Sequence, residues 1–192
     1  MLLAKSKVSC VGLILALAPL SLRAGTIYTT TLLGSNEVPP NASTATGFAT
    51  VTLTGDSLTV DETFSGLTGG TAAAAHIHCC SPVGVNSGVA IPFTGFPAAT
   101  SGTYNNTFDL TLAATYNGVF LTASGGTAAG AEAALIAGLN SFQTYANIHD
   151  ATFGGGEIRG QLEIAPEPAT TGLVLLGLMS MIVRARRVAK RS

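Results

Sequence analysis

The chain has 192 residues and a formal net charge of −1, but this value averages segments of different charge. Between residues 25 and 165, nine acidic side chains stand against one base, Arg159, which gives this segment a net charge of −8. One arginine and no lysine cannot neutralise a phosphate backbone, which excludes nucleic acid and anionic membrane surfaces as partners. A segment of about 140 residues is expected to form a single domain with one core.

The first 24 residues predict a cleaved secretion signal. Lys5 and Lys7 precede a run of thirteen mostly apolar residues, Val8–Leu20, and small residues follow up to Ala24. This order of basic, apolar and cleavage regions is typical of a signal peptide. Thirteen residues are too few to span a bilayer comfortably, so cleavage after Ala24 and export are expected.

The segment that follows breaks into short runs with the alternation of β-strands, separated by turn signals. In one run Ala49, Val51 and Leu53 alternate with phenylalanine and threonine side chains. Packed antiparallel sheets require strands with one solvent-exposed face and one buried face, so an all-β sandwich is expected. The predicted strands are Thr26–Leu33, Gly47–Thr54, Ser57–Phe64, Ala73–His78, Val89–Phe93, Thr103–Leu112, Thr144–His149 and Glu157–Ile164.

Two pairs of charged residues in these strands are interpreted from their spacing. Glu157 and Arg159 are two residues apart, so both are expected on the wet face as a surface ion pair of little energetic weight. Asp61 and Glu62 are adjacent and so point to opposite faces, which makes them a poor acid–base pair. The sequence also has no serine elbow of the GxSxG type. No catalytic residue is predicted, and a non-enzymatic role is expected.

One segment departs from the strand pattern. Residues 127–142, from Thr127 to Phe142, are rich in alanine and place Leu135 and Leu139 at helical spacing. This pattern predicts one short helix, although Gly130 and Gly138 weaken it. The helix is expected to cover one edge or end of the sandwich.

The C-terminal residues 166–192 resemble a PEP-CTERM sorting signal. The triplet Pro166, Glu167 and Pro168 precedes an apolar segment, Ala169–Val183, and five of the last nine residues are basic. A helix of this length reaches about 22 Å, short of the ~30 Å hydrocarbon core, so an ordinary short membrane anchor stays open as the alternative.

The resemblance implies that the triplet serves processing by an exosortase after Sec-type export, with the C-terminal helix held transiently in the inner membrane. The mature domain is then expected in the cell envelope, on the outer surface or in the extracellular matrix. Exopolysaccharide and other envelope components are the expected partners.

Three ordered phrases in the middle of the chain resemble the chordin-type (CHRD) domain: GSNEVPP, AHIH and GGEIRGQ. The resemblance spans nearly all of residues 25–165. It implies an antiparallel Greek-key β-sandwich, immunoglobulin-like or superoxide-dismutase-like, with one short helix near residues 127–142. It implies little about chemistry.

All three histidines of the chain lie in or beside these phrases, at His76, His78 and His149. Period two places His76 and His78 on one strand face, and if Ile77 and Ile148 point into the core, all three imidazoles point away from it. Should the two strands be neighbours, the rings would converge as a three-histidine zinc or copper site with an open fourth position. The alternative is that these histidines only hydrogen-bond and pin the sheet ends together.

Cys79 and Cys80 are the only cysteines of the exported segment, and they are adjacent. A vicinal disulfide, thiolate metal ligands and two small buried side chains are the three alternatives. Two functions follow as hypotheses. The leading one is a non-enzymatic envelope or matrix protein with a binding or structural role, and the alternative is a copper- or zinc-binding protein that uses the three histidines.

Overall fold

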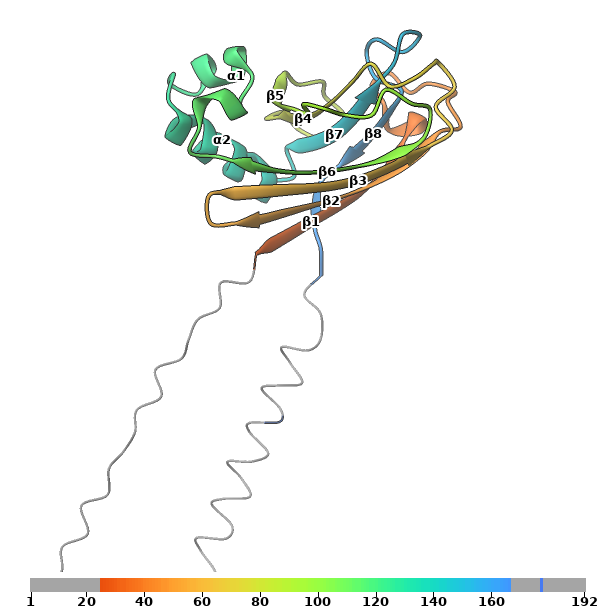
Figure 1. Ribbon diagram of the computed structural model, residues 1–192. Helices are drawn as coiled ribbons and strands as arrows, with labels where there is room; N and C mark the ends of the chain where they lie inside the picture. The colour runs from red at the N-terminus through yellow and green to blue at the C-terminus, as the bar shows by residue number, and fades with distance from the viewer. Residues whose placement is uncertain (1–24, 167–176, 178–192) are drawn as a thin grey trace, which may run out of the picture.

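The computed structural model describes residues 25–166 and residue 177 (Figure 1). The predicted secretion signal, and the predicted sorting segment beyond Pro166, lie outside these residues except for Gly177. Among the described residues, no helix is both long enough and apolar enough to cross a membrane.

Nine strands and two α-helices make up the domain. The strands are β1 (Thr26–Leu33), β2 (Thr46–Thr54), β3 (Ser57–Ser65), β4 (Ala74–Cys79), β5 (Val89–Pro92), β6 (Gly102–Asp109), β7 (Thr144–His149), β8 (Ile158–Gln161) and β9 (Glu163–Ile164). The helices are α1 (Gly118–Ala123) and α2 (Ala128–Asn140), with 3-10 turns at Gly34–Asn36 and Ala113–Thr115.

All strand pairs are antiparallel, in the order β5-β4-β7-β8-β1-β2-β3-β6, with β9 added beside β1. The sheet curls, so that β4, β7 and β8 lie over β1, β2, β3 and β6 (Figure 1). The predicted all-β antiparallel class is confirmed, in the form of one curled sheet.

The core lies between the two halves of the curled sheet. Ile77, Ile148 and Ile158 enter it from one half, and Val51 and Leu58 enter it from the other; all five are fully buried. The hairpin between β2 and β3 turns at Gly55, whose φ of 56° is a conformation that glycine adopts without steric cost. The burial pattern of β2 confirms the alternation predicted for residues 47–54.

The helix predicted over residues 127–142 is confirmed as α2. It begins where the hydroxyl of Thr127 accepts a hydrogen bond from the backbone N–H of Gly130. Leu135 and Leu139 are fully buried, and in Figure 1 both helices lie at one end of the curled sheet. Helix α1 was not predicted, because six residues are too few to establish a helical period.

The last predicted strand is interrupted. Leu162 separates β8 from β9, and its backbone N–H donates to Thr144 while β9 pairs with β1 instead. Ala165 donates to the carbonyl of Ile27, so the chain leaves the domain beside the point where β1 begins. Figure 1 shows both ends of the domain at the same side.

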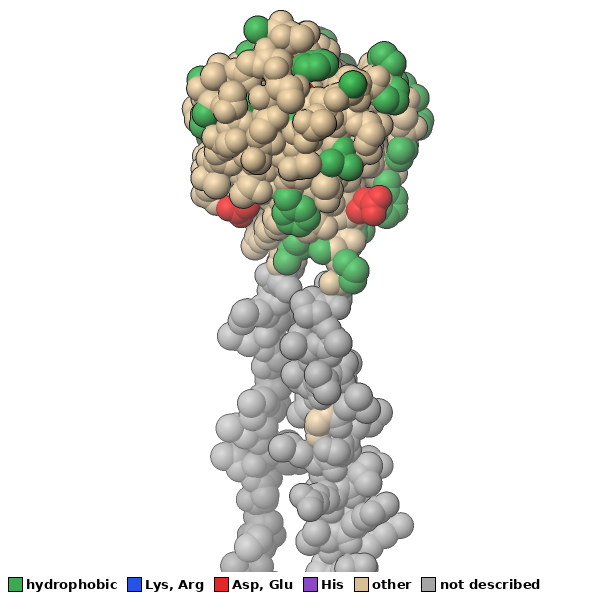
Figure 2. Space-filling model, turned by 90° about the vertical axis from the view of Figure 1, so that its right-hand side faces the viewer, with side chains coloured by type: hydrophobic (Ala, Val, Ile, Leu, Met, Phe, Trp, Pro, Cys, Tyr) green, Lys and Arg blue, Asp and Glu red, His purple; other side chains and the backbone are tan. Residues whose placement is uncertain are grey.

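The described surface carries almost no positive charge. Figure 2 shows a face on which hydrophobic side chains are scattered, two acidic groups lie toward the end where the chain leaves the domain, and no Lys or Arg is visible. Arg159, the only base between residues 25 and 165, is just 3% exposed.

Candidate metal centre

The pairing of β4 with β7 brings the three histidines together. His149 pairs with Ala74, and Asn147 pairs with His76, so the imidazoles of both strands lie on one face of the sheet. One ring nitrogen from each of His76, His78 and His149 lies within 4.8 Å of the others. The ring centroids are 5.0 Å apart for His76 and His149, and 5.4 Å apart for His76 and His78.

Backbone carbonyls orient two of the three rings. Nδ1 of His78 lies 2.9 Å from the carbonyl oxygen of Ser87, and Nδ1 of His149 lies 3.1 Å from that of Gly154. A carbonyl oxygen only accepts, so both Nδ1 atoms donate and each Nε2 is left with its lone pair when the ring is neutral. Histidine ligands of metals typically have such an outer partner, which fixes the tautomer and the ring orientation.

One ring nitrogen of each histidine has no hydrogen-bond partner. Nε2 of His78, Nε2 of His149 and Nδ1 of His76 are buried and unpartnered. Buried polar atoms are rarely left in this state, and each such case needs an explanation. Three neighbouring imidazoles, each with a buried nitrogen that has no partner, have the composition of a ligand set.

The imidazoles are neutral at neutral pH. Burial, followed by the neighbouring imidazoles of His149 and His78, lowers the pKa of His76 to about 4. Burial also lowers the pKa of His78 to about 4, against the opposing hydrogen bond to Ser87, and it lowers the pKa of His149. A metal ion binds the neutral imidazole, so no proton has to be displaced at neutral pH.

The face that carries the histidines points away from the core, but a loop covers part of it. His78 is only 7% exposed because the loop of residues 80–88 lies over it. The ring of Tyr145 stacks on His78 with centroids 4.6 Å apart, and the guanidinium of Arg159 lies 3.6 Å from the centroid of the Tyr145 ring. Asn86 and Val85 in the same loop accept hydrogen bonds from Arg159.

The predicted surface ion pair of Glu157 and Arg159 is wrong, because both side chains are buried and have other partners. Glu157 accepts hydrogen bonds from Ser43 and Thr68 and interacts electrostatically with the nearby carboxyl group of Asp150. In this pair the pKa of Asp150 is raised, first by burial, and that of Glu157 is lowered, because these hydrogen bonds outweigh its burial. The pair joins three loops, and neither carboxylate belongs to the histidine cluster.

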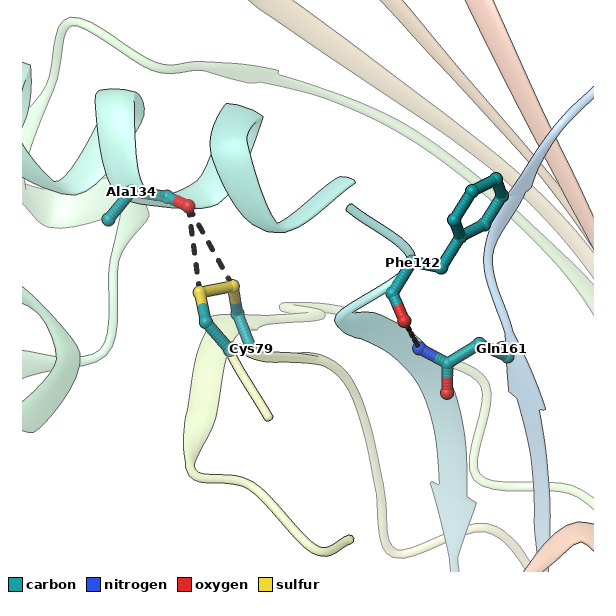
Figure 3. Close-up of a disulfide and its surroundings, with 5 residues drawn as sticks. Cys79, Ala134, Phe142 and Gln161 are labelled. Carbon is teal, nitrogen blue, oxygen red and sulfur yellow. Dashed lines mark hydrogen bonds between the residues drawn. A yellow bond between two sulfur atoms is a disulfide. The ribbon is translucent and has the colours of Figure 1, made fainter. Parts of the chain in front are cut away.

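Cys79 and Cys80 form a disulfide away from the histidines. Both sulfur atoms lie near the carbonyl oxygen of Ala134 on α2 (Figure 3). The distances to this oxygen are 3.9 Å from Sγ of Cys79 and 3.5 Å from Sγ of Cys80. The ligand cluster therefore contains the three histidines and neither cysteine. The predicted sorting residues begin at Pro166, the end of the continuous described segment, so Glu167 and Pro168 lie outside it.

Sequence reasoning identified the three imidazoles but missed the groups that hold them. The carbonyls of Ser87 and Gly154 are backbone atoms, which leave no side-chain signal in a sequence. Tyr145 was detectable only as one aromatic residue in a predicted strand.

Comparison with known proteins supplies a family. The CHRD domain matches residues 28–162, which include every histidine of the cluster and both cysteines. No curated protein and no solved structure matches the chain.

Proposed function

Because the chain belongs to the CHRD domain family, whose domains are secreted or extracellular binding or structural modules, we propose that it is an exported protein that binds one copper or zinc ion. His76, His78 and His149 are the ligands in this proposal. The observation that carries it is the convergence of three imidazoles, each of which has a buried nitrogen without a hydrogen-bond partner.

The donor set selects the class of metal. Three neutral imidazoles suit zinc and copper, whereas calcium and magnesium prefer carboxylate and carbonyl oxygens. Three protein ligands leave a fourth position for water or another small ligand. The family and the sequence add no catalytic group beside this position, so the proposed role is metal binding.

The first prediction tests this role. In the exported protein purified without a histidine tag, the His76→Ala, His78→Ala variant is expected to bind zinc or copper at least about 100-fold more weakly, because loss of an outer partner alone costs 10–100-fold. Metal content per chain and competition with a chelating dye measure the change. Equal uptake by the variant and the parent protein contradicts the proposal.

A matched control separates this site from adventitious binding by acidic side chains. At another part of the domain, Glu132 interacts electrostatically with Asp56 and with Asp109. An Asp56→Asn, Asp109→Asn variant is expected to retain full metal uptake. Thermal unfolding of both variants without metal verifies that the fold is intact.

We also propose that the domain is held in the cell envelope and processed by an exosortase at Pro166, Glu167 and Pro168. In support, β7 runs antiparallel to β8 and ends at His149, so the histidine end of β7 faces away from the place where the chain leaves the domain. An exported protein tethered through its C-terminal segment would thus present His149 outward.

The second prediction concerns this processing. Replacing the triplet with alanines is expected to leave the C-terminal segment attached to the protein, because the processing enzyme loses its recognition sequence. Mass spectrometry of the protein from membrane and extracellular fractions measures the difference. The same mature C-terminus in both forms contradicts an exosortase role and favours an ordinary anchor.

A further inference from the structure

A groove separate from the histidine cluster lies on the same outer face of the sheet. It has a volume of about 470 Å³ and crosses β8, β1 and β2. Thr31 pairs with Phe48, and Thr29 pairs with Glu163, so these four side chains share one face. Val83 and Gly84 of the loop of residues 80–88 form one wall. The volume is in the range of small-molecule binding sites.

The lining combines every type of hydrogen-bonding group with an aromatic ring. Arg159 only donates, Glu163 only accepts, and the amides of Asn36 and Gln161 do both. Phe48 is 47% exposed, a large apolar surface left open beside these polar groups. A sugar ring needs this combination, since its hydroxyls donate and accept while its C–H face packs on an aromatic ring.

Arg159 is held rigidly as a donor. Nη1 donates to Asn86 at 2.8 Å, Nη2 donates to the carbonyl of Val85 at 3.1 Å, and the ring of Tyr145 supports the guanidinium plane. Guanidinium has five N–H groups, so donors remain beyond these two bonds. The carboxyl group of Glu37 interacts with it electrostatically, although no carboxylate of the described residues forms a direct ion pair with it. Arg159 is 3% exposed and lines the groove, so its remaining donors would reach a ligand there through this small exposed part.

Charge selects a neutral ligand over an acidic one. The segment between residues 25 and 165 has a net charge of −8, and Glu163 lines the groove itself. A polyanion would be repelled as it approaches such a surface, whereas a neutral polyhydroxylated chain would not.

We propose that this groove binds a neutral polysaccharide. One sugar ring stacks on Phe48, and its hydroxyls hydrogen-bond with Arg159, Gln161 and Asn36. The inference does not depend on a metal ion at the histidines.

The third prediction tests this site by affinity electrophoresis of the exported protein in gels that contain dextran, galactomannan, hydroxyethyl cellulose or the acidic polymer pectate. We expect retardation by at least one neutral polymer, and a Phe48→Ala variant is expected to bind it at least tenfold more weakly. Retardation by no neutral polymer, retardation by pectate alone, or unchanged binding by the variant overturns the proposal.

Two further variants make this test specific. Phe142 has similar exposure, at 44%, and its ring does not line the groove, so Phe142→Ala is expected to bind as the parent protein does. A His149→Ala variant, which loses a proposed metal ligand whose own hydrogen bond is to Gly154 and not to the loop of residues 80–88, is also expected to keep its retardation. If this histidine variant loses metal uptake but is still retarded by the polymer, the metal site and the groove are independent. Failure of either proposal can then be recognised without the other.

Discussion

Replacing Glu62 with glutamine is expected to make the domain more stable than the parent protein at alkaline pH by about 3 to 5 kcal/mol, with little difference near pH 4. Glu62 is only 1% exposed, and neither carboxyl oxygen has a hydrogen-bond partner. It points into the core from β3, where its register partner on β6 is Tyr104. Burial raises the pKa of this carboxyl from 4.5 to about 8.

The sign follows from proton binding in the two states. Between about pH 4.5 and pH 8 the folded protein keeps the proton on Glu62, while the unfolded chain has released it. The folded state binds more protons, so stability falls as pH rises through this range. Glutamine stays neutral at every pH, so this loss is absent in the variant.

Denaturant unfolding at pH 4, 7 and 9 measures the effect as the difference in unfolding free energy between Glu62→Gln and the parent protein. Asp61, the adjacent carboxylate, lies on the exposed face, and Asp61→Asn is expected to change stability by less than about 0.5 kcal/mol at each pH. Parallel pH profiles for the parent protein and Glu62→Gln would show that the buried carboxyl is not held neutral.

The same residue illustrates what the sequence could reveal. Alternation placed Asp61 and Glu62 on opposite faces, and this is confirmed. Alternation also predicted most strands, because apolar and polar residues alternate with a period of two wherever one face of a strand is buried and the other is exposed to solvent. It could not show that a charged residue stands on the dry side without a partner, since that depends on how the sheet curls.

Arg159 shows that alternation also cannot predict burial on the outer face of the sheet. Its strand alternates as predicted, yet the side chain is buried because the loop of residues 80–88 covers this part of the outer face. Loops have no period, so their path over a sheet cannot be read from spacing. The same limit applies to the histidines, whose convergence required β4 and β7 to be neighbours although 64 residues separate Cys79 from Thr144 along the chain.

From the sequence, Gly138 was expected only to weaken the helix. In the structure this glycine faces the disulfide. A Cβ atom added there would lie 2.4 Å from Sγ of Cys79 and 3.0 Å from Sγ of Cys80. Real Cβ atoms essentially never lie closer than 3.0 Å to another heavy atom of this type. Either α2 or β4 must therefore move when a side chain is introduced. Glycine thus lets the helix approach the disulfide closely.

Gly138→Ala is therefore expected to destabilise the domain by about 1 to 3 kcal/mol, because the overpacking exceeds the gain of about 1 kcal/mol from better helix propensity. In a background with Cys79→Ala and Cys80→Ala both sulfurs are gone, and the same substitution is expected to be neutral or stabilising. A double-mutant cycle from denaturant unfolding measures the coupling. Equal destabilisation in both backgrounds would mean that the disulfide is not the reason why position 138 requires glycine. A sign reversal would show that the glycine and the adjacent cysteines form one packing unit, which fixes α2 against the strand that carries His76 and His78.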